Sequence, residues 1–141
     1  MNNLFVKDED EIKIEILIVQ TKEGYIYCEA KKDKKDLEKL INNDDLEGKI
    51  EEYTIIFKKP NFKDMSEISN NMVNVNSENG VNFNLVGVRM AKIKNLLKKW
   101  DFKDDEDNEI PINNENIDKL NPIIAGTIGV ELDKATSSGM I

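Results

Sequence analysis

Residues 84–100, NLVGVRMAKIKNLLKKW, repeat large apolar side chains at spacings of 4, 3, 4 and 3 residues. This spacing predicts an α-helix with one apolar face, and it leaves four lysines largely off that face. Asn84 can accept a hydrogen bond from a backbone N–H of the first turn, so we expect it to cap the helix. The apolar face must pack against something, and it consists of Val86, Met90, Ile93, Leu97 and Trp100.

The N-terminal part of the chain predicts an antiparallel β-sheet. Residues 11–20, EIKIEILIVQ, place isoleucine at every second position, as in a strand with one buried face. A turn at 22–24 and the segment 25–30, YIYCEA, complete a hairpin. Residues 53–59, YTIIFKK, are rich in β-branched and aromatic side chains and stop at Pro60. We expect three or four strands between residues 4 and 58.

The segments between these elements predict further helices and loops. Residues 31–46 suit a short amphipathic helix that begins near Asp33 or Asp36 and ends around 42–43. A second helix opens at Asn61 or at 63–64, with Asp64 near its positively polarised end. Its apolar members would be Phe62, Met65, Ile68, Met72 and Val73. We expect the polar, asparagine-rich stretch 74–82 to be a loop.

The C-terminal part continues with an acidic turn and two shorter helices. After residue 100 we expect a turn, a short extended piece and a helix capped by Asn113 or Asn114. Pro122 suits the first turn of a last helix over 123–133, in which Ile124, Ile128 and Leu132 recur every four residues. The fold predicted is α+β: one domain over 1–134, β-rich in 4–58 and helical in 61–134, with a flexible tail at 135–141.

Composition excludes several classes of function. The chain has 141 residues and a formal net charge of −8, and Arg89 is the only arginine among 20 basic residues. A nucleic-acid partner is not expected, because phosphate backbones are bound by clustered basic residues. The absence of histidine and the single cysteine, Cys28, remove the commonest general base and any internal disulfide. Cys28 is best explained as a small packing residue.

The sequence also predicts no membrane association. It contains no apolar run of about 20 residues, the length needed to cross a bilayer. Its first residues, MNNLFVKDEDE, lack the basic start and apolar centre of a signal peptide. We therefore expect a cytoplasmic protein in a reducing compartment.

No motif in the sequence carries catalytic or metal chemistry. The phosphate-binding, dinucleotide-binding and nucleophile-elbow patterns are absent, so we expect neither an enzyme nor a cofactor. An EF-hand register beginning at Asp104 would place oxygen ligands at Glu106, Asn108 and Glu115, but Glu109 occupies the position that requires glycine. We interpret 101–109 as a solvated acidic turn that holds no metal.

Two features of the apolar residues leave alternatives open. Trp100 at the end of an amphipathic face is more often a core anchor than a binding hot spot. Met65, Met72 and Met90 could form an adaptable groove for a partner or fill gaps in the core. The candidate partner-binding residues are therefore Val86, Met90, Ile93, Leu97, Trp100, Met65 and Met72.

The order of segments in the second half resembles that of a known protein family. YTIIFKKPNFKDMSEI is followed by a polar gap, a helix around RMAKIKNLLKKWDF, an acidic turn and IPINNENIDKLNP. This order resembles small tail assembly chaperone proteins of tailed bacteriophages over residues 53–132. The resemblance is carried by Arg89, Lys99-Trp100, Asp101-Phe102, 104–109, Pro111, 114–117, Leu120 and Pro122.

The resemblance implies a non-enzymatic role in virion assembly. Such a protein would bind the tape measure protein and recruit tail tube subunits in the cytoplasm of the host. An acidic domain with one apolar groove can shield an amphipathic helix of a client while its charge opposes further association. The alternatives are a structural subunit of the phage tail or baseplate, located in the virion, and a small acidic inhibitor or regulatory protein.

Overall fold

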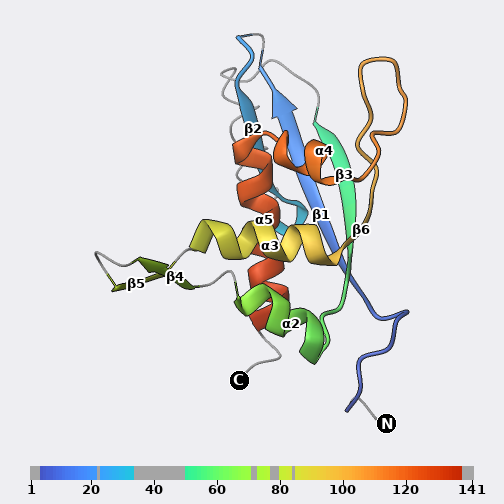
Figure 1. The fold of residues 1–141 in the computed structure, drawn as a ribbon. Helices are drawn as coiled ribbons and strands as arrows, with labels where there is room; N and C mark the ends of the chain where they lie inside the picture. The colour runs from blue at the N-terminus through green and yellow to red at the C-terminus, as the bar shows by residue number, and fades with distance from the viewer. Residues whose placement is uncertain are drawn as a thin grey trace.

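A four-stranded antiparallel sheet forms the centre of the protein in the computed structural model, which describes residues 4–21, 23–33, 50–70, 73–76, 80–83 and 85–137. The strand order is β2 (Ile26–Ala30), β1 (Glu11–Gln20), β3 (Glu51–Lys58) and β6 (Leu97–Trp100). Helices α3 (Leu85–Leu96) and α5 (Pro122–Ser137) cross one another in front of the sheet (Figure 1). The predicted α+β fold is confirmed, with its fourth strand contributed by the C-terminal half.

The alternation predicted for β1 explains how the sheet meets the helices. Ile14, Ile16 and Ile18 point to one face and join the main core with residues of β3, α3 and α5. The other face is also partly buried, because Leu17 and Val19 form a second apolar cluster with Ile50. The prediction of a single buried face was therefore wrong for the second half of this strand.

The predicted helix over 84–100 is wrong at its C-terminal end. Helix α3 ends at Leu96, and the next four residues form the edge strand β6, in which Trp100 lies opposite Ile55 of β3. Pairing with β3 gives these residues backbone partners in the sheet, and this tertiary contact outweighs their helix propensity. Asn84, the predicted cap, lies outside the described residues.

Helix α2 (Phe62–Ser69) begins as predicted and ends early. Asn61 is its N-cap, and the Asn61 and Asp64 side chains bond each other's backbone N–H in a capping box. Ile68 is fully buried, whereas Phe62 is 91% exposed. The predicted loop 74–82 was wrong: β4 (Val73–Asn76) and β5 (Gly80–Phe83) pair as a hairpin, which projects away from the sheet and the helices (Figure 1).

The last two helices follow the predicted caps. Asn113 caps α4 (Asn114–Asp118) by accepting from the backbone N–H of Asn116, and Pro122 opens α5. Helix α5 runs to Ser137, so the predicted tail begins at least three residues too early. Of the helix predicted within 31–46, the structure describes a 3₁₀ turn, η1 (Lys31–Asp33); the remainder lies outside the described residues.

Candidate binding groove

An apolar groove lies where helices α3, α4 and α5 meet. Its volume is about 340 Å³. Helix α3 supplies one wall, and α4 with the start of α5 supplies the other. The lining residues are Val86, Arg89, Met90, Ile93, Ile117, Asp118, Leu120, Pro122, Ala125 and Gly126.

The apolar side chains on the rim of this groove are open to solvent. Val86 is 72% exposed and Met90 is 44% exposed, while Ile93 is buried at the base. A second hollow of about 460 Å³ runs along α5 past Ile123 and Val130, which are also exposed. Both hollows include Arg89, Pro122 and Gly126, so we treat them together as the α3–α5 groove.

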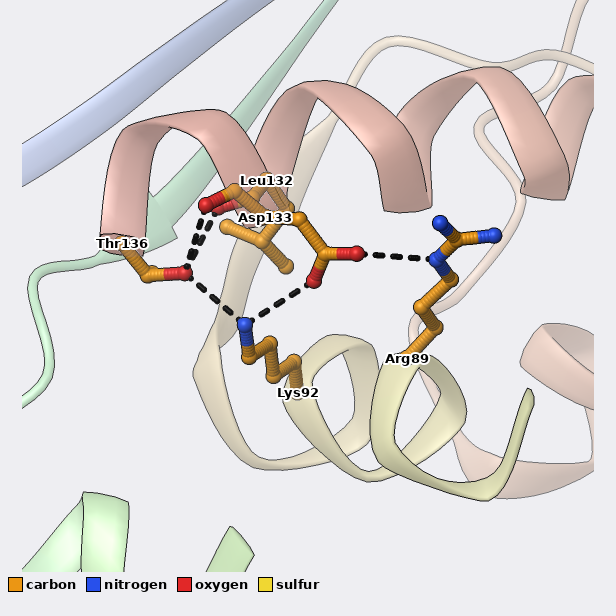
Figure 2. Close-up of polar contacts among 5 residues, drawn as sticks. All are labelled: Arg89, Lys92, Leu132, Asp133 and Thr136. Carbon is orange, nitrogen blue, oxygen red and sulfur yellow. Dashed lines mark hydrogen bonds and ion pairs between the residues drawn. The ribbon is translucent and has the colours of Figure 1, made fainter. Parts of the chain in front are cut away.

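A network of charged side chains joins α3 to α5 beside this groove (Figure 2). Arg89 Nε donates to Asp133 Oδ2 at 2.8 Å, and Lys92 Nζ donates to Asp133 Oδ1 at 2.9 Å. Lys92 Nζ also donates to Thr136 Oγ1 at 2.9 Å, and that hydroxyl donates to the carbonyl oxygen of Leu132 at 2.8 Å. Lys92 is therefore buried with its charge neutralised, on a helix position where sequence spacing predicts exposure.

The electrostatics of the network favour an ionised carboxylate at Asp133. Burial acts to raise the pKa of Asp133, but the hydrogen bonds and positive charges of Arg89 and Lys92 outweigh it and hold the pKa below its ordinary value. Gly129 of α5 lets the Arg89 side chain pass closely, because a Cβ atom there would lie 3.1 Å from Arg89 Cδ. The network thus fixes Arg89 across the seam between the two helices.

The structure separates the predicted partner-binding residues into two groups. Val86, Met90 and Ile93 line the groove, whereas Leu97 and Trp100 belong to β6 and contact the core. Trp100 is buried, and its Nε1 donates to the carbonyl oxygen of Ile110 at 2.6 Å, which confirms its interpretation as a core anchor. Met65 packs half-buried against the same core, and Met72 lies outside the described residues.

Sequence reasoning missed the second wall of the groove. Ile117 and Leu120 were placed on a capped helix without a binding role, and Ile123 was assigned to α5 with no role of its own. A usable signal was present: Ile123 and Val130 lie off the repeat of Ile124, Ile128 and Leu132 that fills the core. Arg89 carried the family resemblance but was not predicted to contribute to a site.

A larger cleft lies elsewhere and is rich in charge. It encloses about 760 Å³ between β1, η1 and the end of α5. Its lysines are paired with glutamates: Lys31 with Glu15 and Glu52 at 3.2 and 2.7 Å, and Lys32 and Lys134 with Glu131 at 2.9 and 3.3 Å. Lys13 also contacts Glu15 at 3.6 Å, so each lysine that lines the cleft has a carboxylate partner, although the lysines outnumber the glutamates.

The acidic turn and the cysteine have local roles. Asp104 Oδ1 accepts hydrogen bonds from the backbone N–H groups of Glu106 and Asn108, which closes the turn. Within the described ranges there is no group of three or more histidine, cysteine or acidic side chains that could hold a metal ion. Burial raises the pKa of the Cys28 thiol, and the side chain packs against the core as predicted.

Comparisons with known proteins yield no match. The chain matches no protein-family model, no curated protein and no solved structure. Over the part of the chain that is described, no helix combines the length and apolar character required to span a membrane.

Proposed function

We propose that this chain is a non-enzymatic tail assembly chaperone of a tailed bacteriophage. It binds the tape measure protein and recruits tail tube subunits in the host cytoplasm. The observation that carries the proposal is the α3–α5 groove, whose exposed apolar rim is formed by Val86, Met90 and Ile123. Four of the residues that carry the family resemblance line the groove: Arg89, Ile117, Leu120 and Pro122.

The geometry suits capture of a helix rather than a small molecule. An amphipathic helix presents apolar side chains at i, i+3, i+4 and i+7, and a groove between packed helices receives them. The two hollows adjoin at Arg89, Pro122 and Gly126, so a client that contacts both would cover more apolar surface than one that fills a single hollow. The net charge of −8 opposes association between loaded chaperones and keeps the complex dispersed.

Co-expression tests this proposal. The partner is the product of a very long, coil-rich open reading frame that the proposal expects directly after this gene. The wild-type chain should co-purify with it, and Val86→Glu or Met90→Glu should reduce capture by about 10-fold or more, because each places a charged side chain in the apolar contact. Tyr25→Glu is the matched control, since Tyr25 is 67% exposed in the β1–β2 connection and lies outside the groove.

Two results of this experiment would contradict different parts of the proposal. Equal capture by Val86→Glu, Met90→Glu and the wild type would show that the groove does not hold the client. No capture by the wild-type chain would contradict the chaperone proposal itself.

A structural subunit of the phage tail is a second candidate. The projecting hairpin β4–β5 favours it, because both strands of a two-stranded sheet are edge strands, and an edge strand can add to the sheet of a neighbouring subunit in a ring (Figure 1). Quantitative mass spectrometry of mature particles distinguishes the two candidates. The chaperone is expected to be absent or present in traces, whereas stoichiometric amounts would favour the structural subunit.

A further inference from the structure

Arg89 lines both hollows of the α3–α5 groove and carries hydrogen-bond donors that no described residue uses. Its Nε binds Asp133, and among the described residues this is the only hydrogen bond that the guanidinium makes. Its two terminal amino groups lie on the side away from Asp133 (Figure 2). The side chain is 32% exposed and lines both hollows of the groove. A guanidinium held in this way can receive a further ligand.

The charges around Arg89 favour an anion. Asp133 accepts from both Arg89 and Lys92, so two cations face one carboxylate and one positive charge remains. Asp118, the acidic residue of the first hollow, is neutralised by Lys94 at 2.7 Å. In the second hollow, Glu131 is bound by Lys32 and Lys134. Glu29 also lines this hollow, so that the lining residues and their ion-pair partners together comprise five basic and four acidic side chains. The groove thus has a small excess of positive charge on a chain whose net charge is −8.

The surroundings of Arg89 determine which anion fits. A guanidinium binds a planar carboxylate through two parallel N–H donors, and the bond strengthens where water is excluded. Val86, Met90 and Ile123 stand around this position and would exclude water once an apolar surface covers them. The ligand should thus combine one carboxylate with apolar groups on either side.

We infer that the α3–α5 groove binds an amphipathic helix that carries one aspartate or glutamate within its apolar face. The carboxylate binds the terminal amino groups of Arg89, and the flanking apolar side chains cover Val86, Met90 and Ile123. This inference rests on the proposed function, in that the helix belongs to the client. It adds the chemistry by which the groove selects one helix over another.

A pair of synthetic peptides tests the inference with the intact wild-type chain. One is a fluorescein-labelled amphipathic helix of about 18 residues, long enough to hold helical structure, with a single glutamate between leucines on its apolar face. The other replaces that glutamate by glutamine. Fluorescence anisotropy should show that the glutamate peptide binds at least about 10-fold more tightly. The reason is that a carboxylate gains a charge–charge attraction to Arg89 in a groove without water, and the neutral amide of glutamine does not. Equal affinity for the two peptides, or no binding of the glutamate peptide, would overturn the inference.

Variants of Arg89 add a second comparison. Arg89→Gln should abolish the preference for glutamate, and Arg89→Lys, which keeps the charge and loses the paired donors, should retain only a small part of it. Full preference in either variant would contradict the assignment to the guanidinium. Urea unfolding of each variant checks that it is folded. If a variant does not fold, the comparison of the two peptides on the wild-type chain still tests the inference.

Failure of this inference and failure of the proposed function give different results. If Val86→Glu loses the tape measure protein but the wild type binds both peptides equally, the chaperone role stands and the carboxylate anchor is wrong. If the wild type discriminates between the peptides but captures no tape measure protein, the chemistry of the groove stands and the chaperone role is wrong. If sedimentation shows a dimer that Val86→Glu dissociates, a second copy occupies the groove and the inference is overturned.

Discussion

Trp100 stabilises the packing of the edge strand β6 against the core. Its ring is buried, lies 5.3 Å from the ring of Phe102, and donates a hydrogen bond to Ile110 across the acidic turn. Trp100→Ala should lower the free energy of unfolding by about 3–5 kcal/mol, because it leaves a cavity and an unpaired carbonyl. Urea denaturation measures this, with Tyr25→Ala as an exposed control. A loss below about 0.5 kcal/mol would place the ring on a partner surface instead.

The ion pairs of Asp133 make the free energy of unfolding depend on pH. The pKa of the Asp133 carboxyl is lower in the folded state than its ordinary value of 3.8. Its contribution to the free energy of unfolding is therefore complete above that ordinary value and is lost as the pH falls through the lower, folded-state pKa. Asp133→Asn should reduce the free energy of unfolding by about 2–3 kcal/mol at pH 7, where Arg89 and Lys92 lose a charged acceptor. The difference between wild type and variant should shrink as the pH is lowered below about 4. A difference independent of pH would contradict the ion pairing.

These two residues differ in how far sequence alone could predict them. For Trp100, sequence favoured a core anchor over a binding hot spot but kept the residue among the candidate partner-binding residues, and its burial supports the core anchor. Lys92 was predicted only to lie off the apolar face of its helix. Its burial could not be predicted, because the position of its partner Asp133, 41 residues away, depends on how α3 crosses α5. Long-range charge pairing of this kind leaves no periodic signal.

Among the secondary structure elements, α2 offers the clearest test of a locally encoded boundary. Asn61 and Asp64 satisfy each other's backbone donors at its start. Asn61→Ala should cost about 0.5–2 kcal/mol of stability, since one helix N–H loses its acceptor. Ser66→Ala, on the exposed surface of the same helix, serves as the control and should change stability by less than about 0.5 kcal/mol. Equal effects in urea unfolding would show that the cap contributes nothing specific.

The boundaries set by neighbouring residues were predictable, and those set by distant partners were not. Pro60, Asn61, Asn113 and Pro122 begin or end elements as their local chemistry requires. The end of α3 was missed because β6 exists only through pairing with β3. The same error put Leu97 in the helical binding face, although the rest of that face, Val86, Met90 and Ile93, does line the groove.

At the scale of the whole molecule, the two faces of α3 have different roles. Val88, Ala91 and Leu96 are buried in the body of the protein, while Val86 and Met90 remain open beside α4 and α5. The sheet and the crossed helices therefore form a support that holds one apolar groove, with Arg89 fixed inside it. Sequence could predict the α+β class and part of one groove wall, but not the second wall, because that wall depends on how three helices meet.

The central claim, that the α3–α5 groove holds a helix of the tape measure protein, is tested most directly by site-specific photocrosslinking. A photoreactive phenylalanine analogue replaces Met90 in the groove or, as the control, Tyr25 outside it, and the chain is irradiated in cells that assemble tails. The account predicts a covalent adduct with the tape measure protein from position 90 and none from position 25. No such adduct from position 90, or equal adducts from both positions, would contradict it.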